Sequence, residues 1–335
     1  MRRWSLLVIG PLISIVALVL ILRRIEFAHF VEALSEIQPF WLAPIIPLYV
    51  IAISIRGVRW QLMLYPVKAV RWRVTTSVIF LGLMANNLLP ARLGELVRAF
   101  ALSSREQLGT AFSLASIAAE RIFDGLALFV IFWVTATLTQ FPAQLDATLS
   151  RVAWGVGSVF LLAFAFVLTA RLAPGFVERL VSRATAWLPE RVSARSLELL
   201  KSALRALTFL RADRRMVFFV LLTLAIWLVE GVVLWLATLA FGIDPDLRLA
   251  YFTLVLIGFS VAVPSAPGYV GVFEAGVVLA FAAFGIGREV ALSYAVVVHG
   301  LQFAVIGAGG LISLHALGMS FGSLRRMARA EELGS

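Results

Sequence analysis

The stretch NNLLPARLGELVR, residues 86–98, decides the fold because it places amides, a proline, a glycine and opposite charges inside an apolar region. That region extends from Val74 to Leu102 and is otherwise apolar enough to enter a membrane. Proline removes a backbone donor and breaks a helix, and glycine permits tight turns. Such backbone survives at membrane depth only inside protein or beside a wet cavity. The stretch therefore predicts an interrupted membrane helix that borders a polar chamber.

The composition of the whole chain also indicates a membrane protein. Of 335 residues, 61% are hydrophobic and 14% are charged, against about 45–50% and about 25% in soluble domains. The absence of cysteine excludes disulfides, thiolate metal sites and a cysteine nucleophile. The three histidines have no metal-ligand spacing, so we expect no metal site and no cofactor. The net charge of +10 suits loops that face anionic lipid, and we expect no nucleic-acid partner.

Six segments are long and apolar enough to cross a bilayer as helices, which takes about 20 residues. They are residues 5–22, 41–64, 111–138, 152–170, 216–241 and 290–316. Two further apolar regions are interrupted, 74–102 at residues 86–92 and 249–284 at residues 264–271. We therefore predict an all-α polytopic membrane protein with about six spanning helices and two broken-helix regions.

Lysine and arginine set the expected orientation, because cytoplasmic loops carry an excess of both. Residues 65–73 (preceded by Arg56 and Arg59), residues 171–215 and the tail are basic, whereas the loops 139–150 and 242–247 carry only aspartate. With the basic loops in the cytoplasm, both termini are cytoplasmic. The first interrupted region then begins and ends inside, and the second begins and ends outside. Each is expected to be a re-entrant hairpin, and the two enter from opposite faces.

The expected organisation is one membrane domain over residues 1–335. Its first half covers 1–170, a cytoplasmic amphipathic linker covers 171–215, the second half covers 216–320 and a short basic tail covers 321–335. In the linker, apolar residues recur at helical spacing among arginines, which indicates helices lying on the membrane surface. The linker is either a structural connection or a regulatory or lipid-head-group surface.

The two interrupted regions, LLPARLGE and VPSAPGYVGVFE, share a pattern. In each, a glycine follows a proline by four residues and a glutamate comes soon after. The residues concerned are Pro90, Gly94 and Glu95 in the first region and Pro264, Pro267, Gly268, Gly271 and Glu274 in the second. With opposite directions of approach, the similarity suggests two halves of inverted topology, as in many secondary transporters. Chance patterning of proline and glycine is the alternative.

The residues around the first break are suited to an anion. A helix that restarts after a break presents free N–H groups and positive partial charge, which suits a lipid phosphate. Arg92 could add a forked contact to that phosphate. Asn86 and Asn87 could bind backbone carbonyls or a head group.

Glu95 needs a partner if it is buried, and the candidates are Arg92, Arg98 and Arg121. Ionisable groups inside a membrane are functional by default, so Glu95 is expected to face a ligand or take up a proton. The alternative is that Arg92, Glu95 and Arg98 only pin the hairpin at the interface.

A second charged cluster lies in AAERIFD, which contains Glu120, Arg121 and Asp124. Glu120 and Asp124 are four residues apart and share a helix face, and both stay ionised only with a cation nearby. Two interpretations of this cluster stay open: an ion-pair network that braces the helices, and a functional role. Glu230, His299 and Gln302 are further polar residues in apolar segments, although a lone histidine is more often hydrogen-bonded scaffolding.

The residues expected to bind a ligand or line its path form one set, with no catalytic residue among them. The set is Asn86, Asn87, Pro90, Arg92, Gly94, Glu95, Arg98, Glu120, Arg121, Asp124, Glu230, Pro264, Pro267, Gly268, Gly271, Glu274, His299 and Gln302.

With NNLLPARLGELVR, AERIFD, PSAPGYVGVFE and HGLQF in this order, the chain resembles the lysylphosphatidylglycerol synthase transmembrane-region family over nearly its whole length. The resemblance implies a lipid-translocating membrane domain. Its matching positions are Pro90, Arg92, Gly94, Glu95, Glu120, Arg121, Asp124, Pro267, Gly268, Gly271 and Glu274. The bifunctional members carry a further aminoacyl-transfer domain, which is not expected here, so the substrate stays open.

The expected function is translocation of a phospholipid or polyprenyl-phosphate-linked lipid between the leaflets of a bacterial inner membrane, with lipid head groups as partners and no enzymatic activity. No GxxxxGK[ST] sequence occurs, so no ATP-binding P-loop is expected, and energy would come from an ion gradient unless the process is downhill. The alternatives are an integral-membrane enzyme acting on a lipid phosphate or lipid-linked sugar, and a scaffold for lipid synthesis. A homo-oligomer or a lipid-synthesis partner is also open.

Overall fold

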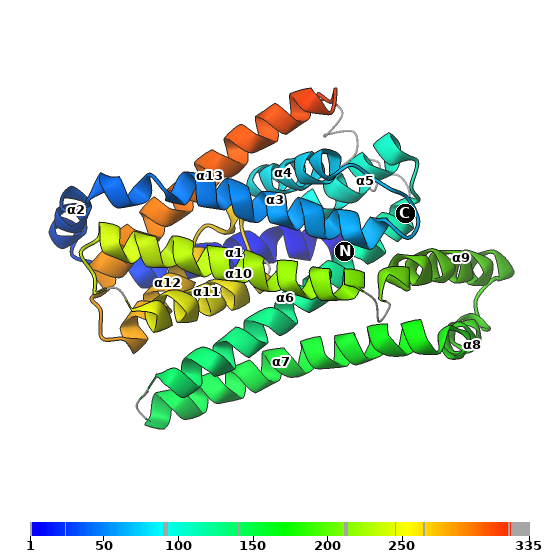
Figure 1. Ribbon diagram of the computed structural model, residues 1–335. Helices are drawn as coiled ribbons and strands as arrows, with labels where there is room; N and C mark the ends of the chain where they lie inside the picture. Colours follow the sequence, from blue (N-terminus) through cyan, green and yellow to red (C-terminus); the bar gives the residue numbers. More distant parts are fainter. Residues whose placement is uncertain are drawn as a thin grey trace.

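The computed structural model describes residues 2–23, 25–89, 93–139, 141, 143–210, 214–244, 246–263, 265–320 and 322, with backbone only for 2–10 and 143–146. Every regular element in this part of the chain is helical (Figure 1). The first half contains α1 (Arg2–Leu22), α2 (Phe27–Ser35), η1 (Pro39–Leu42), α3 (Ile45–Leu64), α4 (Trp72–Leu88), α5 (Gly94–Glu106), α6 (Thr110–Leu138) and α7 (Ala143–Leu172). The rest contains α8 (Pro174–Thr185), α9 (Glu190–Ala206), η3 (Leu207–Phe209), α10 (Arg214–Ala240), α11 (Leu247–Ala262), η4 (Pro267–Tyr269), α12 (Val272–Ala283) and α13 (Arg288–Ala316).

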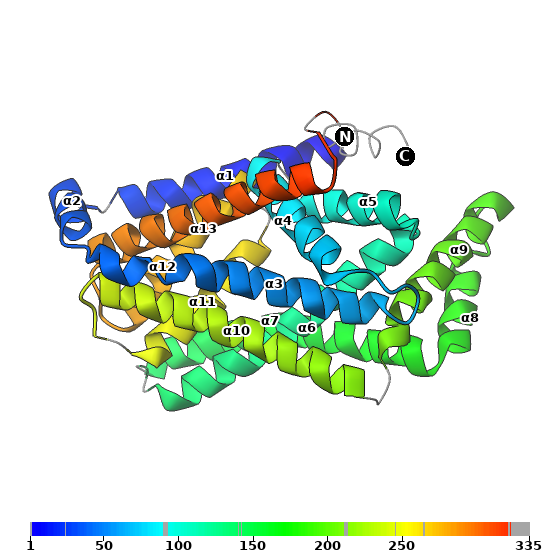
Figure 2. The same ribbon diagram turned by 45° about the horizontal axis from the view of Figure 1, so that its top comes forward.

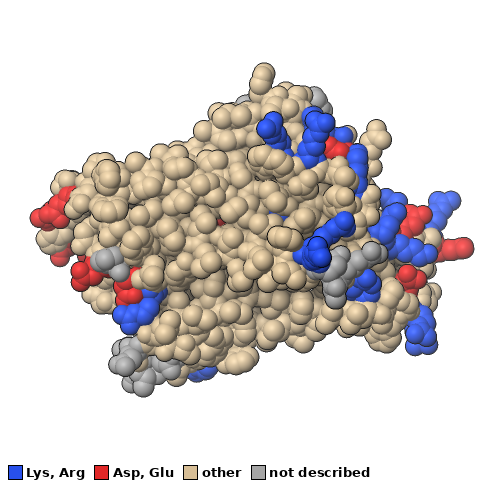
Figure 3. Space-filling view, in the orientation of Figure 1, with Lys and Arg blue, Asp and Glu red and all other residues tan. Residues whose placement is uncertain are grey.

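The helices confirm an all-α polytopic membrane protein. Among the described residues, four segments are long and apolar enough to cross a membrane: Pro39–Leu64, Ala147–Leu172, Arg214–Ala240 and Arg288–Ala316. The two other predicted spans fall in α1 and α6, and α6 carries the charged residues of AAERIFD. Large apolar side chains such as Leu162 and Ile312 are about 70% exposed, as expected where lipid covers the surface. Figure 3 shows a broad band without charge, with lysine and arginine gathered mainly at the end where α8 and α9 lie.

Each interrupted region is a hairpin of two helices with a break between them. α4 packs against α5, and α11 packs against α12. Figures 1 and 2 place the open ends of these hairpins at opposite ends of the molecule and the breaks in its middle. α4 also contacts η4, so the two breaks meet. The two hairpins therefore approach each other from opposite directions, as the sequence predicts.

The contacts between helices repeat when the two halves are exchanged. The elements α3, α4, α5 and α6 correspond, in order, to α10, α11, α12 and α13. α4 packs on α13 as α11 packs on α6, α5 packs on α6 as α12 packs on α13, and α3 packs on its counterpart α10. The helices that precede or flank these sets fit the same exchange, because α2 packs on α13 as α9 packs on α6. This pattern agrees with the predicted inverted repeat; the predicted boundaries of its halves at residues 170 and 216 stay a prediction.

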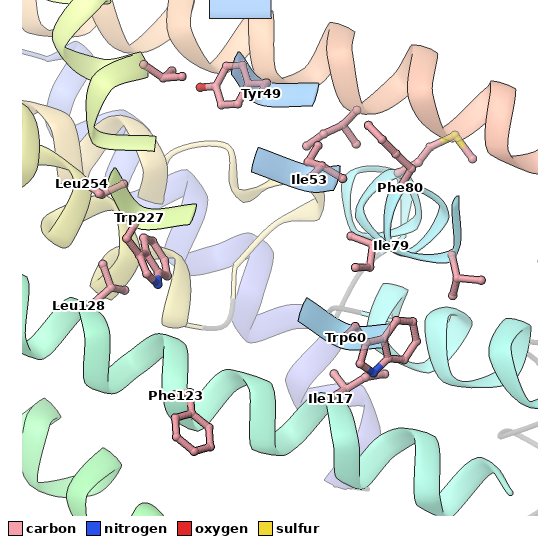
Figure 4. Close-up of a cluster of buried hydrophobic side chains, with 14 of the residues drawn as sticks. Tyr49, Ile53, Trp60, Ile79, Phe80, Ile117, Phe123, Leu128, Trp227 and Leu254 are labelled. Carbon is pink, nitrogen blue, oxygen red and sulfur yellow. The ribbon is translucent and has the colours of Figure 1, made fainter. Parts of the chain in front are cut away.

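The core lies where the two halves meet, and it surrounds the breaks. Figure 4 shows buried side chains from both halves in this part of the core. They include Tyr49, Ile53 and Trp60 of α3, Ile79 and Phe80 of α4, Ile117, Phe123 and Leu128 of α6, Trp227 of α10 and Leu254 of α11. Burial of these apolar groups holds the hairpins against the long helices and leaves a polar space between the breaks.

Candidate functional site

A cavity of about 230 Å³ lies between the two breaks and receives side chains from both halves. Its predicted members are Asn86, Asn87, Gly94, Glu95, Arg98, Arg121, Glu230, His299 and Gln302. Aromatic residues complete the wall, namely Tyr49, Trp227, Tyr269 and Phe273. The fold therefore gathers residues from eight α-helices around one polar space.

The remaining predicted residues lie behind this wall or outside the description. Glu120 and Asp124 are buried next to the cavity without lining it, and Glu274 is turned away from it. Pro267, Gly268 and Gly271 shape the second break. Pro90, Arg92 and Pro264 lie outside the described residues, so the expected phosphate contact of Arg92 stays a prediction.

A buried network of arginines holds Glu120 and Asp124. Arg98 forms two hydrogen bonds to Glu120, at 3.2 and 2.6 Å. Arg59 forms two to Asp124, at 2.6 and 3.1 Å, and its Nη2 also lies 3.2 Å from Glu120 Oε1. Such forked, charge-assisted bonds are the strongest kind. The two carboxylates therefore have the nearby cations that the sequence argument requires, and the network joins α3, α5 and α6.

Two more arginines, Arg121 and Arg56, line the cavity. Arg121 has a side chain 43% exposed, and its guanidinium lies 3.0 Å from Glu120 and 3.9 Å from Glu95. Glu95 is 38% exposed. Arg56 lies 2.5 Å from Glu230 and 3.4 Å from Asp124. Among the described candidates, Arg121 is therefore the partner of Glu95, while Arg98 is committed to Glu120.

Arg56 and Arg59 are site residues that the sequence did not single out. They fall within the predicted span 41–64, just before the basic loop 65–73, and α3 places both inside the bundle. Arg59 is fully buried. Two signals could have found them: the spacing of three residues, which puts both on one helix face, and the need of Glu120, Asp124 and Glu230 for counter-ions.

The first break is held by an amide. The backbone N–H of Gly94 donates to Asn86 Oδ1 at 2.8 Å, so Asn86 binds a backbone donor and not the carbonyl that was one of the expectations. A Cβ at Gly94 would lie 2.0 Å from the carbonyl oxygen of Gly82. Only glycine therefore lets α5 start this close to α4.

The second break is held by a carboxylate. Glu274 accepts a hydrogen bond from the backbone N–H of Gly271 at 2.6 Å through Oε2, and its Oε1 lies 2.7 Å from Nδ1 of His299. Gly271 and Gly268 have φ of 92° and 68°, in the left-handed region that glycine adopts without strain. Phe273 stacks on the His299 ring at 4.1 Å. His299 thus links this break to the cavity, whereas Glu274 serves the break itself.

The fold and the site define a class of protein. It is a polytopic helical bundle in which two opposed broken-helix hairpins surround a charged cavity. No three His, Asp or Glu side chains come together as a metal site in the described part of the chain.

The family described as lysylphosphatidylglycerol synthase TM region matches residues 7–310, and the chain belongs to this family.

Two curated relatives are similar to this chain. Glycosyltransferase AglD from Haloferax volcanii is 29% identical over 94% of this chain, which spans 55% of that relative's length. A UPF0104 membrane protein from Methanothermobacter thermautotrophicus is 24% identical over 95% of this chain and 97% of its own length. No solved structure matches the chain.

Proposed function

We propose that this protein moves a lipid with a phosphate-containing head group, a phospholipid or a polyprenyl-phosphate-linked sugar, between the leaflets of the membrane. The observation that carries the proposal is the charged cavity at the meeting point of the two breaks. A lipid-linked sugar is supported by the similarity to a protein named as a glycosyltransferase. A phospholipid is supported by the family's description.

The size and charge of the cavity suit a head group alone. Its volume of about 230 Å³ lies below the range of about 300–1,000 Å³ typical of drug-sized ligand sites. Arg121 and Arg56 supply positive charge for a phosphate, and Glu95 and Glu230 can balance a cationic group or accept hydrogen bonds from sugar hydroxyls. The lipid tails would remain against the apolar exterior.

Energy for directed movement could enter at the Glu274–His299 pair. With Glu274 ionised, its Oε1 has no proton, so Nδ1 of His299 is the donor in the 2.7 Å contact. In neutral His299 the other ring nitrogen is then an acceptor. His299 lines the cavity, which supports proton uptake there as the coupling step.

For the orientation, we place the basic end in the cytoplasm of a bacterial cell, because lysine and arginine gather at the end formed by α8, α9 and the start of α10 (Figure 3). Both termini are then cytoplasmic. The α4–α5 hairpin opens to the inside and the α11–α12 hairpin to the outside.

The test is leaflet-specific labelling of head groups in proteoliposomes. We expect wild-type protein to accelerate exchange over protein-free vesicles for a phosphatidylglycerol or a polyprenyl-phosphate sugar, and Glu95→Gln, Arg121→Gln and Glu274→Gln to slow it. Arg183→Gln, at an exposed position of α8, is the control, because it removes one arginine charge as Arg121→Gln does. Equal rates with and without protein, for both lipids, would overturn the proposal.

The similarity to AglD supports a second candidate, glycosyl transfer to or from a lipid-linked sugar. Purified protein in detergent would then form product from a lipid-linked sugar without any membrane. A scaffold function instead predicts that folded Arg121→Gln and Glu95→Gln proteins work as well as wild type.

A further inference from the structure

A second hollow lies at the basic end of the molecule, away from the central cavity. It is a groove of about 1050 Å³ between the first turn of α6, the junction of α7 with α8, and α9. Figure 2 shows α8 and α9 extending beyond the bundle on this side. The groove shares no lining residue with the central cavity, so the proposed function does not use it.

The floor of the groove is the N-terminus of a long helix. α6 runs for 29 residues from Thr110, and its N-cap, Gly109, has no side chain with which to cap it. The first N–H groups of a helix have no partner within it, and the helix dipole places positive partial charge there. Gly109, Thr110 and Ala111 all line the groove. This end of α6 therefore offers backbone donors to an anion.

An independent observation comes from Ser202 of α9. The residue is 9% exposed and lines the groove. Among the described residues its hydroxyl has no hydrogen-bond partner, whereas Ser196 on the same helix donates to the carbonyl of Val192 at 2.8 Å. A Cβ at Gly109 would lie 3.6 Å from the Ser202 oxygen, so this hydroxyl sits beside the start of α6. Because the rest of Ser202 is buried, the groove that it lines is the side from which a partner for its hydroxyl can come.

The charges around the groove select an anion. Arg171, Lys201 and Arg205 line it, and Lys201 and Arg205 are four residues apart on one edge of α9. Arg171 is fixed by a 3.0 Å hydrogen bond from Nε to the carbonyl of Leu210. Arg195, Glu178 and Glu198 also line the groove, and Glu198 lies 3.2 Å from Arg195 in an exposed pair. Four cations against two carboxylates leave the lining positive.

We propose that this groove is a phosphate-binding site. The backbone N–H groups at the start of α6 and the Ser202 hydroxyl donate to the phosphate oxygens, and Arg171, Lys201 and Arg205 supply the countercharge. The phosphate belongs either to a lipid head group at the membrane surface or to a soluble phosphate compound. Because α9 packs on α6, the ligand ties α9 to the helix that carries Glu120, Arg121 and Asp124.

The experiment measures binding to the full chain. One arm uses inorganic phosphate and detergent-purified protein in equilibrium dialysis. The other uses protein in nanodiscs of zwitterionic lipid with a small fraction of labelled phosphatidic acid. Ser202→Ala and Arg205→Gln should each weaken binding about tenfold, since a hydrogen bond to a charged group is lost. Arg191→Gln, at an exposed position of α9 outside the groove, should leave binding unchanged.

Binding of inorganic phosphate indicates a soluble ligand, and binding of phosphatidic acid alone indicates a lipid head group; either supports the site if Ser202→Ala weakens it. Ser202→Ala removes only one oxygen atom, and its fold is checked by gel filtration. Failure of both probes to bind, or equal binding by wild type, Ser202→Ala and Arg205→Gln, overturns the proposal. Lipid exchange through the central cavity can persist in either case, so the two proposals fail separately.

Discussion

Arg56 of α3 and Glu230 of α10 form a 2.5 Å ion pair across the contact between the two halves of the molecule. The two helices are counterparts in the repeat, and the pair borders the central cavity. The Arg56 guanidinium also lies 5.2 Å from the centre of the Trp227 ring, a cation–π distance. One contact therefore belongs both to the joint between the halves and to the wall of the site.

Glu230→Leu should destabilise the protein, because Arg56 would lose its nearest carboxylate and keep its 3.4 Å contact with Asp124 and its contact with the Trp227 ring. Removal of one partner of a buried ion pair costs about 3–5 kcal/mol, and the remaining contacts should hold the loss near the lower end. The double variant Arg56→Met/Glu230→Leu should recover part of this loss. Thermal unfolding of the wild type, the two single variants and the double variant in detergent gives a double-mutant cycle. Additive losses of stability would show that the two side chains are not coupled.

Arg98 and Arg121 should respond differently to the same change. Arg98 is buried and committed to Glu120, so Arg98→Gln should lower yield and unfolding temperature. Arg121 is partly exposed to the cavity, so Arg121→Gln should fold and slow lipid exchange. Expression, gel filtration and the exchange assay separate the two effects. If Arg98→Gln folds normally and only exchange falls, the network is not a brace.

Gly94→Ala should disrupt the first break. Its Cβ would meet the Gly82 carbonyl oxygen at 2.0 Å, so α5 must move away from α4. Gly155→Ala in α7 is the matched control, because nothing lies within 4 Å of its Cβ and alanine favours a helix by about 1 kcal/mol. Unfolding temperatures should therefore fall for Gly94→Ala and hold or rise for Gly155→Ala.

His299→Gln should remove the response of the lipid exchange rate to an imposed pH gradient, since the glutamine amide takes up no proton near neutral pH. The variant is measured beside wild type in proteoliposomes with and without the gradient. A gradient that changes neither rate would remove His299 and Glu274 from the coupling step, while leaving passive exchange open.

Asp246 should stabilise α11 in a manner that depends on pH. Its carboxylate accepts from the backbone N–H of Arg248 at 2.8 Å, and hydrogen bonds from the Arg248 side chain hold the pKa of Asp246 below its ordinary value. This contribution is complete above the unfolded pKa of about 4 and is lost as pH falls through the lower, folded pKa. Asp246→Ala should cost about 1 kcal/mol near pH 7 and much less near pH 2, as unfolding at the two pH values would show.

The sequence predicts the breaks well because proline and glycine act locally, so residues 86–98 and 264–271 can be read without knowledge of their neighbours. The charges of AAERIFD are also visible, since ionised groups stand out in an apolar helix. Partner choice is not local. Arg56 and Arg59 lie far from Asp124 in the chain, and only the packing of α3 on α6 and α10 brings them together.

The direction of a side chain is equally hard to read from sequence. Glu95 and Glu274 follow their breaks at similar spacing, which suggests similar roles. In the structure Glu95 faces the cavity, while Glu274 turns back to bind Gly271 and His299. Glu274 lies three positions after Gly271, whereas Glu95 directly follows Gly94, and only the longer spacing lets the carboxylate reach back to the N–H at the start of its helix.

The two breaks differ in the group that clasps the restarting helix, Asn86 at the first and Glu274 at the second. If the same group held both breaks, the two breaks would respond alike to a change in pH. An amide carries no charge at any physiological pH, whereas a carboxylate beside an imidazole can exchange protons with its surroundings. The two breaks are therefore chemically different although the helices around them repeat, and only the second is held by groups that can take up or release a proton.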